Sequence, residues 1–510
     1  MKQFTGMTRR DFLVQAGFAA LASQATFALE AAGSSNVRLS TPSGRLIGVE
    51  SEGVRVFRGV PFAAAPTGKL RFLPPQRSRP WQEERDATRF AAAAMQTSIP
   101  GVECSEDCLY LNVWAPEGKG PFPVFVWIHG GGFTGGRSFD PVCDGAAFAK
   151  RGIVCVTVAY RLGVFGFLDM EPLLGEQYKG TANNGLRDLI ASLQWIQENI
   201  EAFGGDPARV TIGGESAGAK LTDILLGIPA AQPLFHQMVS QSGGAERVFS
   251  RDHSAVVALA FQREWRGHSP ADLYSAPAVD LIQAQHDFLQ QWPEHFPLRA
   301  AIDAQLLLQL PITTIASGST RAKRLLIGTM RDESALFIGP HPQSQASAGE
   351  LGNLQVQQFS QVASHYPALY PELSQEQLRI RSLTAEEYWI PSMRVAQAHE
   401  KGGGTSWMYR LDFAESSGWL RGYAYHSMDV RLVWNQPSST VANAADEAEL
   451  ALKIHQAWVA FIRGEVPAST GLPAWPPFDS ARRATMILDK KCRVENKPQE
   501  GELRLWDGVL

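Results

Sequence analysis

The sequence predicts an α/β fold with a mostly parallel, twisted central sheet and helices on both of its faces. Residues 123–128 and 153–159 are almost wholly apolar, which is typical of strands buried on both sides. Residues 184–200 then repeat apolar side chains at helical spacing. Further strand-like runs lie at residues 44–49, 54–60, 106–114 (an alternating run), 210–212, 237–241, 324–328 and 405–413. This alternation of strands with helices predicts a doubly wound sheet.

Length and composition narrow the class of protein. The chain has 510 residues, of which 45% are hydrophobic and 19% charged, and a net charge of −4. This composition predicts a globular protein with a large core, and the charge gives no reason to expect nucleic acid or an anionic membrane as a partner. Length alone allows several domains. We predict a single domain over residues 36–505, with helical insertions at about 250–320 and 340–400 over the strand ends.

The five cysteines do not form a recognisable framework. They are too few and too scattered for a disulfide scaffold. The spacing of Cys104 and Cys108 allows either a small-loop disulfide or two free thiols, and it lacks the paired ligands of a zinc site. We therefore expect no metal.

Residues 1–28 are predicted to be an export signal rather than part of the fold. Residues 8–13, Thr-Arg-Arg-Asp-Phe-Leu, match the twin-arginine pattern, with Val14 where a lysine is common. The moderately apolar run that follows is too short and too polar for a membrane span, so no stable membrane insertion is expected. An amphipathic first helix is the alternative interpretation. Because the twin-arginine machinery exports folded protein, the expected location is the periplasm or the outside of a bacterial cell.

One stretch carries a candidate nucleophile. Residues 214–218, Gly-Glu-Ser-Ala-Gly, fit the G-x-S-x-G pattern of a nucleophile elbow, with Ser216 at the centre. A strand-like run precedes the motif, and residues 217–226 predict a helix that ends at Gly227. A serine in a sharp turn needs neighbours without bulk, and the helix N-terminus beneath it favours developing negative charge. A tight turn whose serine only caps the helix is the alternative.

A glycine run after the apolar strand decides between these alternatives. His129-Gly130-Gly131-Gly132 can form an oxyanion loop, because backbone without side chains lets N–H groups approach an ester carbonyl. Residues 130–135 also satisfy G-x-G-x-x-G, but no helix pattern opens directly after them, and the next strand ends in Tyr160-Arg161 where a dinucleotide site needs an acid. The glycine run and the elbow support each other, so we interpret Ser216 as a nucleophile.

A serine nucleophile needs a base, and the base needs an orienting acid. In chain order Ser, acid, His, the acid is expected at Asp332 or Glu333, where a predicted strand ends. Chain order alone does not choose between these two acids. Among the later histidines, His426 lies on a loop after a late strand and is favoured. The other candidates are His341, which follows the acid too closely, His365, and His399 and His455 in helix-like stretches.

With these residues assembled, the sequence resembles the type-B carboxylesterase/cholinesterase family of α/β-hydrolases. The resemblance covers about residues 36–505 and is strongest over 55–245. It rests on the family-like blocks at residues 57–63, 106–116, 160–163, 184–188 and 203–218, of which the last matches the family's serine signature.

The resemblance implies a role for each candidate residue. Ser216 would be the nucleophile, His426 the general base and acid, and Glu333 rather than Asp332 the orienting acid, since the family places its acid second in this pair. Gly131, Gly132 and Ala217 would supply the oxyanion-hole N–H groups.

The chain also departs from the family pattern. Leu221 stands where relatives commonly have a serine that supports the acid, and Lys220 beside it is unusual. Ala94 and Met95 lie where relatives have a cysteine partner for the one at 108, and residues 428–432 differ from the usual Glu-Leu-Pro-Phe. These departures affect the surroundings of the acid and the wall of the pocket.

The function that follows is hydrolysis of small-molecule carboxylic esters through an acyl-enzyme, without metal or organic cofactor. An acyltransferase or amidase using the same triad is the alternative within the enzymes, and a non-catalytic cholinesterase-like binding protein is the alternative outside them. The sequence does not identify the ester. The aromatic residues of the 250–320 insertion line either the substrate pocket or the core; they are Phe261, Trp265, Phe288, Trp292 and Phe296.

Overall fold

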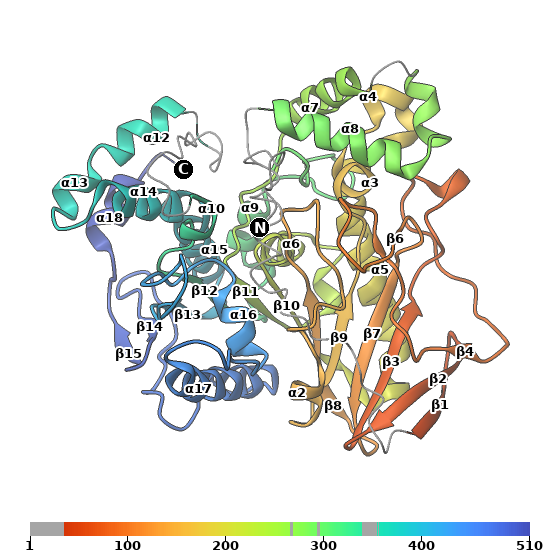
Figure 1. The fold of residues 1–510 in the computed structure, drawn as a ribbon, viewed down its shortest axis with the longest axis horizontal. Coiled ribbons are helices and arrows are strands. Elements are labelled where there is room, and N and C mark those ends of the chain that lie inside the picture. Colours follow the sequence, from red (N-terminus) through yellow and green to blue (C-terminus); the bar gives the residue numbers. More distant parts are fainter. Residues whose placement is uncertain (1–34, 266–268, 293–295, 339–353, 355, 510) are drawn as a thin grey trace, which may run out of the picture.

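The computed structural model describes residues 35–265, 269–292, 296–338, 354 and 356–509. The predicted signal at 1–28, His341 and residues 340–353 of the second predicted insertion lie outside them. Within the described chain, 13 strands form one sheet (Figure 1). In spatial order its main path is β1 (Ser35–Thr41), β2 (Gly44–Ser51), β3 (Val54–Pro61), β7 (Tyr110–Pro116), β9 (Val154–Val158), β8 (Phe122–Ile128), β10 (Gly205–Glu215), β11 (Gln237–Gln241), β12 (Arg324–Met330), β13 (Thr405–Leu411), β14 (Thr485–Leu488) and β15 (Arg493–Glu495).

The centre of the sheet is parallel, as predicted. All neighbouring strands from β9 to β14 run parallel, whereas β1, β2, β3, β7 and β9 pair antiparallel at one edge and β15 pairs antiparallel at the other. β4 (Arg85–Asp86) pairs with β2, and β5 (Ala93–Ala94) forms a small separate sheet with β6 (Cys104–Ser105). The carboxyl ends of β10, β12 and β13 therefore meet at one edge of the sheet, where a site can form.

Helices cover both faces of the sheet. The α-helices are α2 (Ala146–Ala149), α3 (Gly163–Phe167), α4 (Glu171–Leu174), α5 (Asn184–Asn199), α6 (Ala217–Leu226), α7 (Arg251–Glu264), α8 (Ala278–Gln291), α9 (Pro311–Thr314), α10 (Ala335–Ile338), α12 (Val356–Ala363), α13 (Tyr366–Leu369), α14 (Gln375–Thr384), α15 (Ile390–Lys401), α16 (Met428–Val433), α17 (Ala444–Ile462) and α18 (Glu500–Leu505). A π-helical turn, η8 (Ala385–Trp389), joins α14 to α15. None of the helices in the described residues is long and apolar enough to cross a membrane.

Strand β8 shows how the two cores arise. Its valines, Val124 and Val126, belong to the core that includes α5 and α6, whereas Phe125 and Trp127 belong to the core that includes α2, α16 and α17. Because successive side chains of a strand point to opposite faces, a continuous apolar run fills both cores at once. This arrangement confirms the prediction of a doubly covered sheet.

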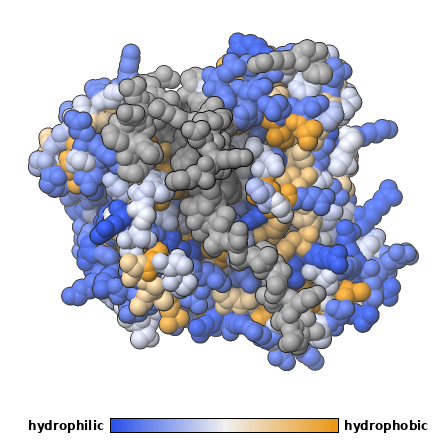
Figure 2. Space-filling model, in the orientation of Figure 1, coloured by the Kyte–Doolittle hydropathy of each residue, from blue (hydrophilic) through white to orange (hydrophobic). Residues whose placement is uncertain are grey.

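The predicted insertion at about 250–320 is helical and lies at the end of the molecule where α3 and α4 lie (Figure 1). It contains α7, a short 3-10 helix, η6 (Pro270–Tyr274), and α8, and α7 contacts both α4 and α8. The face shown in Figure 2 is mostly hydrophilic with small scattered hydrophobic patches.

One predicted strand differs from its expected pattern. The run at 106–114 was expected to alternate, but β7 begins at Tyr110 and is buried from Leu111 to Pro116. The polar residue that suggests alternation, Asn112, is itself buried, and its amide donates to Ser138 and Thr157 while its oxygen accepts from the Gly59 N–H. A polar residue in a strand suggests a solvent-exposed position, but Asn112 is buried because its amide makes all of these hydrogen bonds inside the protein.

Candidate active site

Ser216 lies in a strained turn between β10 and α6. Its backbone has φ 56° and ψ −123°, a conformation that costs energy for a residue with a side chain. A Cβ at Gly214 would lie 2.5 Å from the Gly218 carbonyl carbon, and one at Gly218 would overlap the Ile128 carbonyl oxygen. The two glycines are therefore required by close packing, and the Ser216 N–H donates to the Gln241 carbonyl at 2.9 Å, which ties the turn to β11.

The structure brings three predicted residues into one hydrogen-bonded chain. Ser216 Oγ lies 2.8 Å from His426 Nε2, and His426 Nδ1 lies 2.6 Å from Glu333 Oε2. Glu333 follows β12 and His426 precedes α16, so the parallel strands carry all three residues to the same edge of the sheet. A His426 protonated on Nδ1 donates to Glu333 and accepts from Ser216, which is the arrangement that can move a proton from a serine hydroxyl to an imidazole.

Asp332 takes a different place from Glu333. Its carboxylate accepts from the Ala424 N–H at 3.0 Å and from Arg331 Nε at 2.9 Å, and its own N–H donates to the Ala424 carbonyl. Asp332 therefore fastens the loop that leads to His426, while Glu333 contacts the imidazole. Of the two acids that chain order left open, the structure places Glu333 against the histidine.

The other candidate histidines in the described residues lie elsewhere. His399 is buried and bonded to Ser406 Oγ at 2.8 Å, and His455 is buried and bonded to the Val433 carbonyl at 2.8 Å. His365 precedes α13. Burial lowers the pKa of His399 to about 4, which keeps its ring neutral near pH 7.

Glu333 is supported by a residue that the sequence interpretation missed. Its Oε1 accepts from Ser242 Oγ at 2.5 Å and from the Met330 N–H at 2.8 Å. Ser242 directly follows β11, the neighbour of β12, and has φ 62°. Leu221, where relatives commonly have a supporting serine, is instead fully buried in the apolar core. One signal in the sequence could have indicated Ser242. It directly follows β11, which lies in the sheet between the strand that leads to Ser216 and the strand that leads to Glu333.

Glu215 is a second carboxylate at the imidazole. Its Oε1 lies 3.2 Å from His426 Nε2 and accepts from Ser427 Oγ at 2.5 Å. Burial raises the pKa of Glu215, although nearby His426 partly opposes the shift. Burial by itself lowers the pKa of His426, but Glu215 and Glu333 outweigh burial, so the pKa of this histidine lies above its ordinary value.

The glycine run forms a loop beside Ser216. The Thr134 and Gly135 N–H groups donate to the Gly131 carbonyl, and Gly131 and Gly132 have φ 115° and 61°. A Cβ at Gly130 would lie 3.1 Å from the Ser216 Cβ, so the loop packs directly against the serine. The N–H groups of Gly131 and Gly132 donate to no acceptor among the described residues. Ala217 is the first residue of α6, so its N–H has no acceptor within the helix.

The structure excludes the dinucleotide interpretation of this loop. No helix starts after the glycines until α2 at Ala146. At the end of β9, Tyr160 donates to the His129 carbonyl and Arg161 pairs with Asp188, so neither position offers an acid to a ribose. The described residues contain no group of His, Cys, Asp or Glu that could hold a metal ion.

The predicted aromatic set divides between core and site. Phe261, Trp265 and Phe288 are buried in the core, whereas Trp292 and Phe296 are partly buried at its border. Phe296 reaches the glycine loop, because its ring carbon lies 2.7 Å from where a Cβ at Gly132 would stand. Cys104 and Cys108 are both free thiols, and burial raises the pKa of each.

Comparison with known proteins decides the family. The family model described as the carboxylesterase family matches residues 34–506. The chain belongs to the carboxylesterase family. It is therefore a type-B carboxylesterase enzyme, a serine ester hydrolase in its family activity.

Bacterial relatives resemble this carboxylesterase along most of their length. It is 34% identical over 482 residues to the para-nitrobenzyl esterase of Bacillus subtilis (strain 168), covering 90% of this chain and 96% of that protein. It is 33% identical over 460 residues to the fumonisin B1 esterase of Sphingopyxis macrogoltabida, covering 86% of this chain and 84% of that protein.

Solved structures agree with the fold. The solved structure titled PNB esterase superimposes with a TM-score of 0.82 at 32% identity, covering 92% of this chain and 100% of that chain. A carboxylesterase of Geobacillus stearothermophilus gives 0.81 at 32% identity, covering 92% and 99%. The carboxylesterase described here thus has the predicted α/β-hydrolase fold.

Proposed function

We propose that this carboxylesterase hydrolyses carboxylic esters through an acyl-enzyme formed on Ser216. In this mechanism His426 takes the proton from the Ser216 hydroxyl as the oxygen attacks the ester carbonyl, and returns it to the leaving alcohol. Glu333 holds the imidazole in the required tautomer and stabilises the imidazolium. Water then attacks the acyl-enzyme by the same steps and releases the acid.

The oxyanion forms against backbone N–H groups in this proposal. Gly131, Gly132 and Ala217 would donate to the carbonyl oxygen as it becomes negative, and the N-terminus of α6 adds its dipole. One such donor is worth about 3 kcal/mol of transition-state stabilisation. The absence of side chains in the loop supports this assignment, since the backbone itself then contacts the substrate.

The observation that carries the proposal is the hydrogen-bonded chain from Ser216 through His426 to Glu333 at a positive-φ serine. A fluorophosphonate probe should label Ser216, and Ser216→Ala should abolish both labelling and hydrolysis of 4-nitrophenyl esters, a loss on the order of 10⁶ in kcat. A panel of increasing acyl length then defines the size of the acyl site. If the alanine variant kept full activity, the mechanism would be wrong.

The rival transfer chemistry has its own readout. An acyltransferase or amidase would use the same three residues, and added alcohol or amine would then divert the acyl group from water into a new ester or amide. We expect hydrolysis to dominate in water with a modest concentration of alcohol. Failure of the fluorophosphonate to react with the folded protein would favour the non-catalytic binding protein.

We further propose that the protein acts outside the cytoplasm. The support is the Thr-Arg-Arg-Asp-Phe-Leu segment at residues 8–13 and the apolar run after it. Replacing Arg9 and Arg10 with lysine should leave the esterase in the cytoplasmic fraction, and unchanged export would argue against the twin-arginine machinery as a partner.

A further inference from the structure

Lys220 is a buried cation beside the nucleophile. It stands on α6 one helical turn after Ser216, its N–H donates to the Ser216 carbonyl at 2.9 Å, and its side chain is almost fully buried. The proposed mechanism does not use it. Since residues four apart lie on the same face of a helix, the lysine side chain leaves α6 on the side of Ser216.

Two aromatic rings connect the ammonium to the reacting groups. Lys220 Nζ lies 4.8 Å from the centre of the Tyr388 ring and 5.5 Å from that of Phe296. The Tyr388 ring lies 4.6 Å from the His426 ring, and the Phe296 ring packs on Gly132. The ammonium therefore shares one ring neighbour with the imidazole and another with the oxyanion loop.

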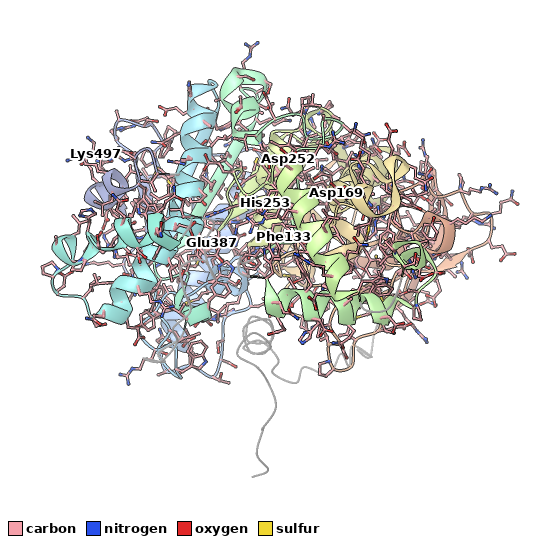
Figure 3. All side chains as sticks on the ribbon, turned by 90° about the horizontal axis from the view of Figure 1, so that it is seen from above. Phe133, Asp169, Asp252, His253, Glu387 and Lys497 are labelled. Atoms are coloured by element: carbon pink, nitrogen blue, oxygen red, sulfur yellow. The ribbon has the colours of Figure 1, made fainter. Side chains whose placement is uncertain are left out.

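Glu387 joins Lys220 to a second buried cation. Lys220 Nζ donates to Glu387 Oε1, and Arg247 Nη2 lies 3.2 Å from Glu387 Oε2. Arg247 also lies 3.6 Å from Glu386 Oε1 and donates to the Glu386 carbonyl. Glu387 lies on the π-helical turn η8 and, viewed from above, near the middle of the molecule (Figure 3).

Three buried cations act on Glu387. Burial alone raises the pKa of a carboxyl, yet the pKa of Glu387 lies below its ordinary value because Arg247, Lys220 and Arg299 outweigh burial. Glu215, whose Oε1 lies 3.2 Å from His426 Nε2, has a raised pKa because it is buried. Burial lowers the pKa of Lys220, and Glu387 opposes this shift.

The ammonium also retains hydrogen-bonding capacity. An ammonium has three N–H donors, and within the described part of the chain Glu387 is the acceptor for one of them. Arg247 Nε is likewise buried without an acceptor in that part of the chain. Buried charged donors gain most from a negatively charged oxygen, because the surroundings screen little.

We propose that Lys220 gives this esterase a preference for esters that carry a carboxylate, which the lysine ammonium binds while the ester carbonyl lies at Gly131 and Gly132. The inference rests on the proposed function, because it takes Ser216 as the point of attack. The carboxylate belongs either to the acyl part or to the alcohol part, and the substrates below distinguish these two sources.

Matched pairs of esters test the preference. For the acyl part, mono-4-nitrophenyl adipate is compared with 4-nitrophenyl hexanoate; for the alcohol part, 4-carboxyphenyl butyrate is compared with phenyl butyrate. We expect the wild type to favour the anionic member of at least one pair in kcat/KM. Lys220→Met should lower that ratio about 10- to 150-fold, the range of a hydrogen bond to a charged group. Lys220→Arg should retain most of it.

Lys323 offers a matched control. Its Nζ lies 4.3 Å from the Phe235 ring centre and donates to the Gln232 carbonyl, but it precedes β12 and so lies at the opposite end of that strand from Glu333. Lys323→Met should leave the ratio unchanged. Glu387 keeps Arg247 as a counter-ion in Lys220→Met, and thermal unfolding checks that this variant is folded.

Several outcomes would overturn the inference. A wild type that favours the neutral member of both pairs contradicts it, and so does a Lys220→Met variant that loses activity equally on both members, which indicates a structural ion pair. If Lys220→Met does not fold, competition in the wild type decides. Either adipate must inhibit hexanoate-ester hydrolysis more strongly than hexanoate does, or 4-hydroxybenzoate must inhibit it more strongly than phenol does, and failure of both overturns the inference. A folded wild type that cleaves none of the four esters would instead refute the proposed function, and the inference with it.

Discussion

Replacing Ser242 with alanine should lower kcat about tenfold or more while KM changes little. The variant removes the hydroxyl that donates to Glu333 Oε1 at 2.5 Å, and leaves the Met330 N–H as the other donor to that oxygen. A hydrogen bond to a charged group is worth about 1.5–3 kcal/mol, or about 10- to 150-fold in rate if it acts wholly in the transition state. Because one donor remains, we expect the lower part of this range.

The effect should fall on kcat because of when Glu333 acts. In the proposed mechanism the imidazole becomes charged only as Ser216 attacks. Loss of a hydrogen bond to Glu333 should therefore destabilise the transition state more than it destabilises the complex with bound ester. The assay is steady-state hydrolysis of 4-nitrophenyl butyrate over a range of concentrations, with thermal unfolding of each variant.

Ser240 provides the control for Ser242. It lies two residues earlier on β11, is fully buried, and donates to Asp223 Oδ2 at 2.9 Å rather than to the proposed triad. Ser240→Ala therefore removes the same group from a position two residues earlier and should leave kcat nearly unchanged. Equal losses in the two variants, or an unchanged kcat in folded Ser242→Ala, would refute the argument.

Three further variants probe the charge and shape of the site and the acid stability of the fold. Glu215→Gln removes one of the two carboxylates that raise the pKa of His426 against burial. The pKa of His426 should therefore fall, and the acid limb of the kcat/KM profile should move to lower pH. An acid limb at the same pH in pH-rate measurements would contradict this. Gly132→Ala places a Cβ 2.7 Å from the Phe296 ring at a residue with φ 61°. We expect at least a hundredfold loss of kcat/KM, which is the effect of losing about one oxyanion donor. Near-normal activity would exclude Gly132 from the oxyanion hole. Burial lowers the pKa of His399 to about 4, so the native state holds this ring neutral, and its contribution to stability, about 3 kcal/mol, is present above pH 6.5 and lost as the pH falls toward 4. His399→Gln should therefore flatten the decline of the urea midpoint between pH 6.5 and 4, and an unchanged slope would count against this linkage.

Much of the candidate site could be predicted from the sequence because its requirements are local. The close contact between Gly214 and Gly218 demands glycine at both positions, and it leaves the G-x-S-x-G pattern in five consecutive residues. The positions of Glu333 and His426 follow from strand order, since β12 and β13 run parallel to β10 and end at the same edge. The roles of these residues, the boundaries of the 36–505 domain and the export signal remain predictions.

Other features could not be predicted because they depend on contacts between distant segments. Ser242 reaches Glu333 across 91 residues through a positive-φ turn, and a lone serine after a strand carries no recognisable pattern. Phe296 packs on a loop more than 160 residues earlier, and its sequence neighbourhood does not distinguish it from the core aromatics. The expected alternation of 106–114 was wrong because Asn112 satisfies its hydrogen bonds inside the sheet.

The two departures on α6 have different physical consequences. With Ser242 donating to Glu333 from the end of β11, position 221 has no need of a hydroxyl, and Leu221 fills apolar space under the sheet instead. Position 220 lies one turn after the nucleophile, where a neutral side chain would remove one of the cations that act on Glu387. A lysine there places a positive charge against the rings that border the imidazole and the glycine loop. A charge that only stabilised the fold would be equally useful farther from Ser216, and an apolar group of similar volume is often as stable as a buried ion pair. The proposed preference for a charged ester accounts for the position of Lys220 next to these rings, which fold stability alone does not require.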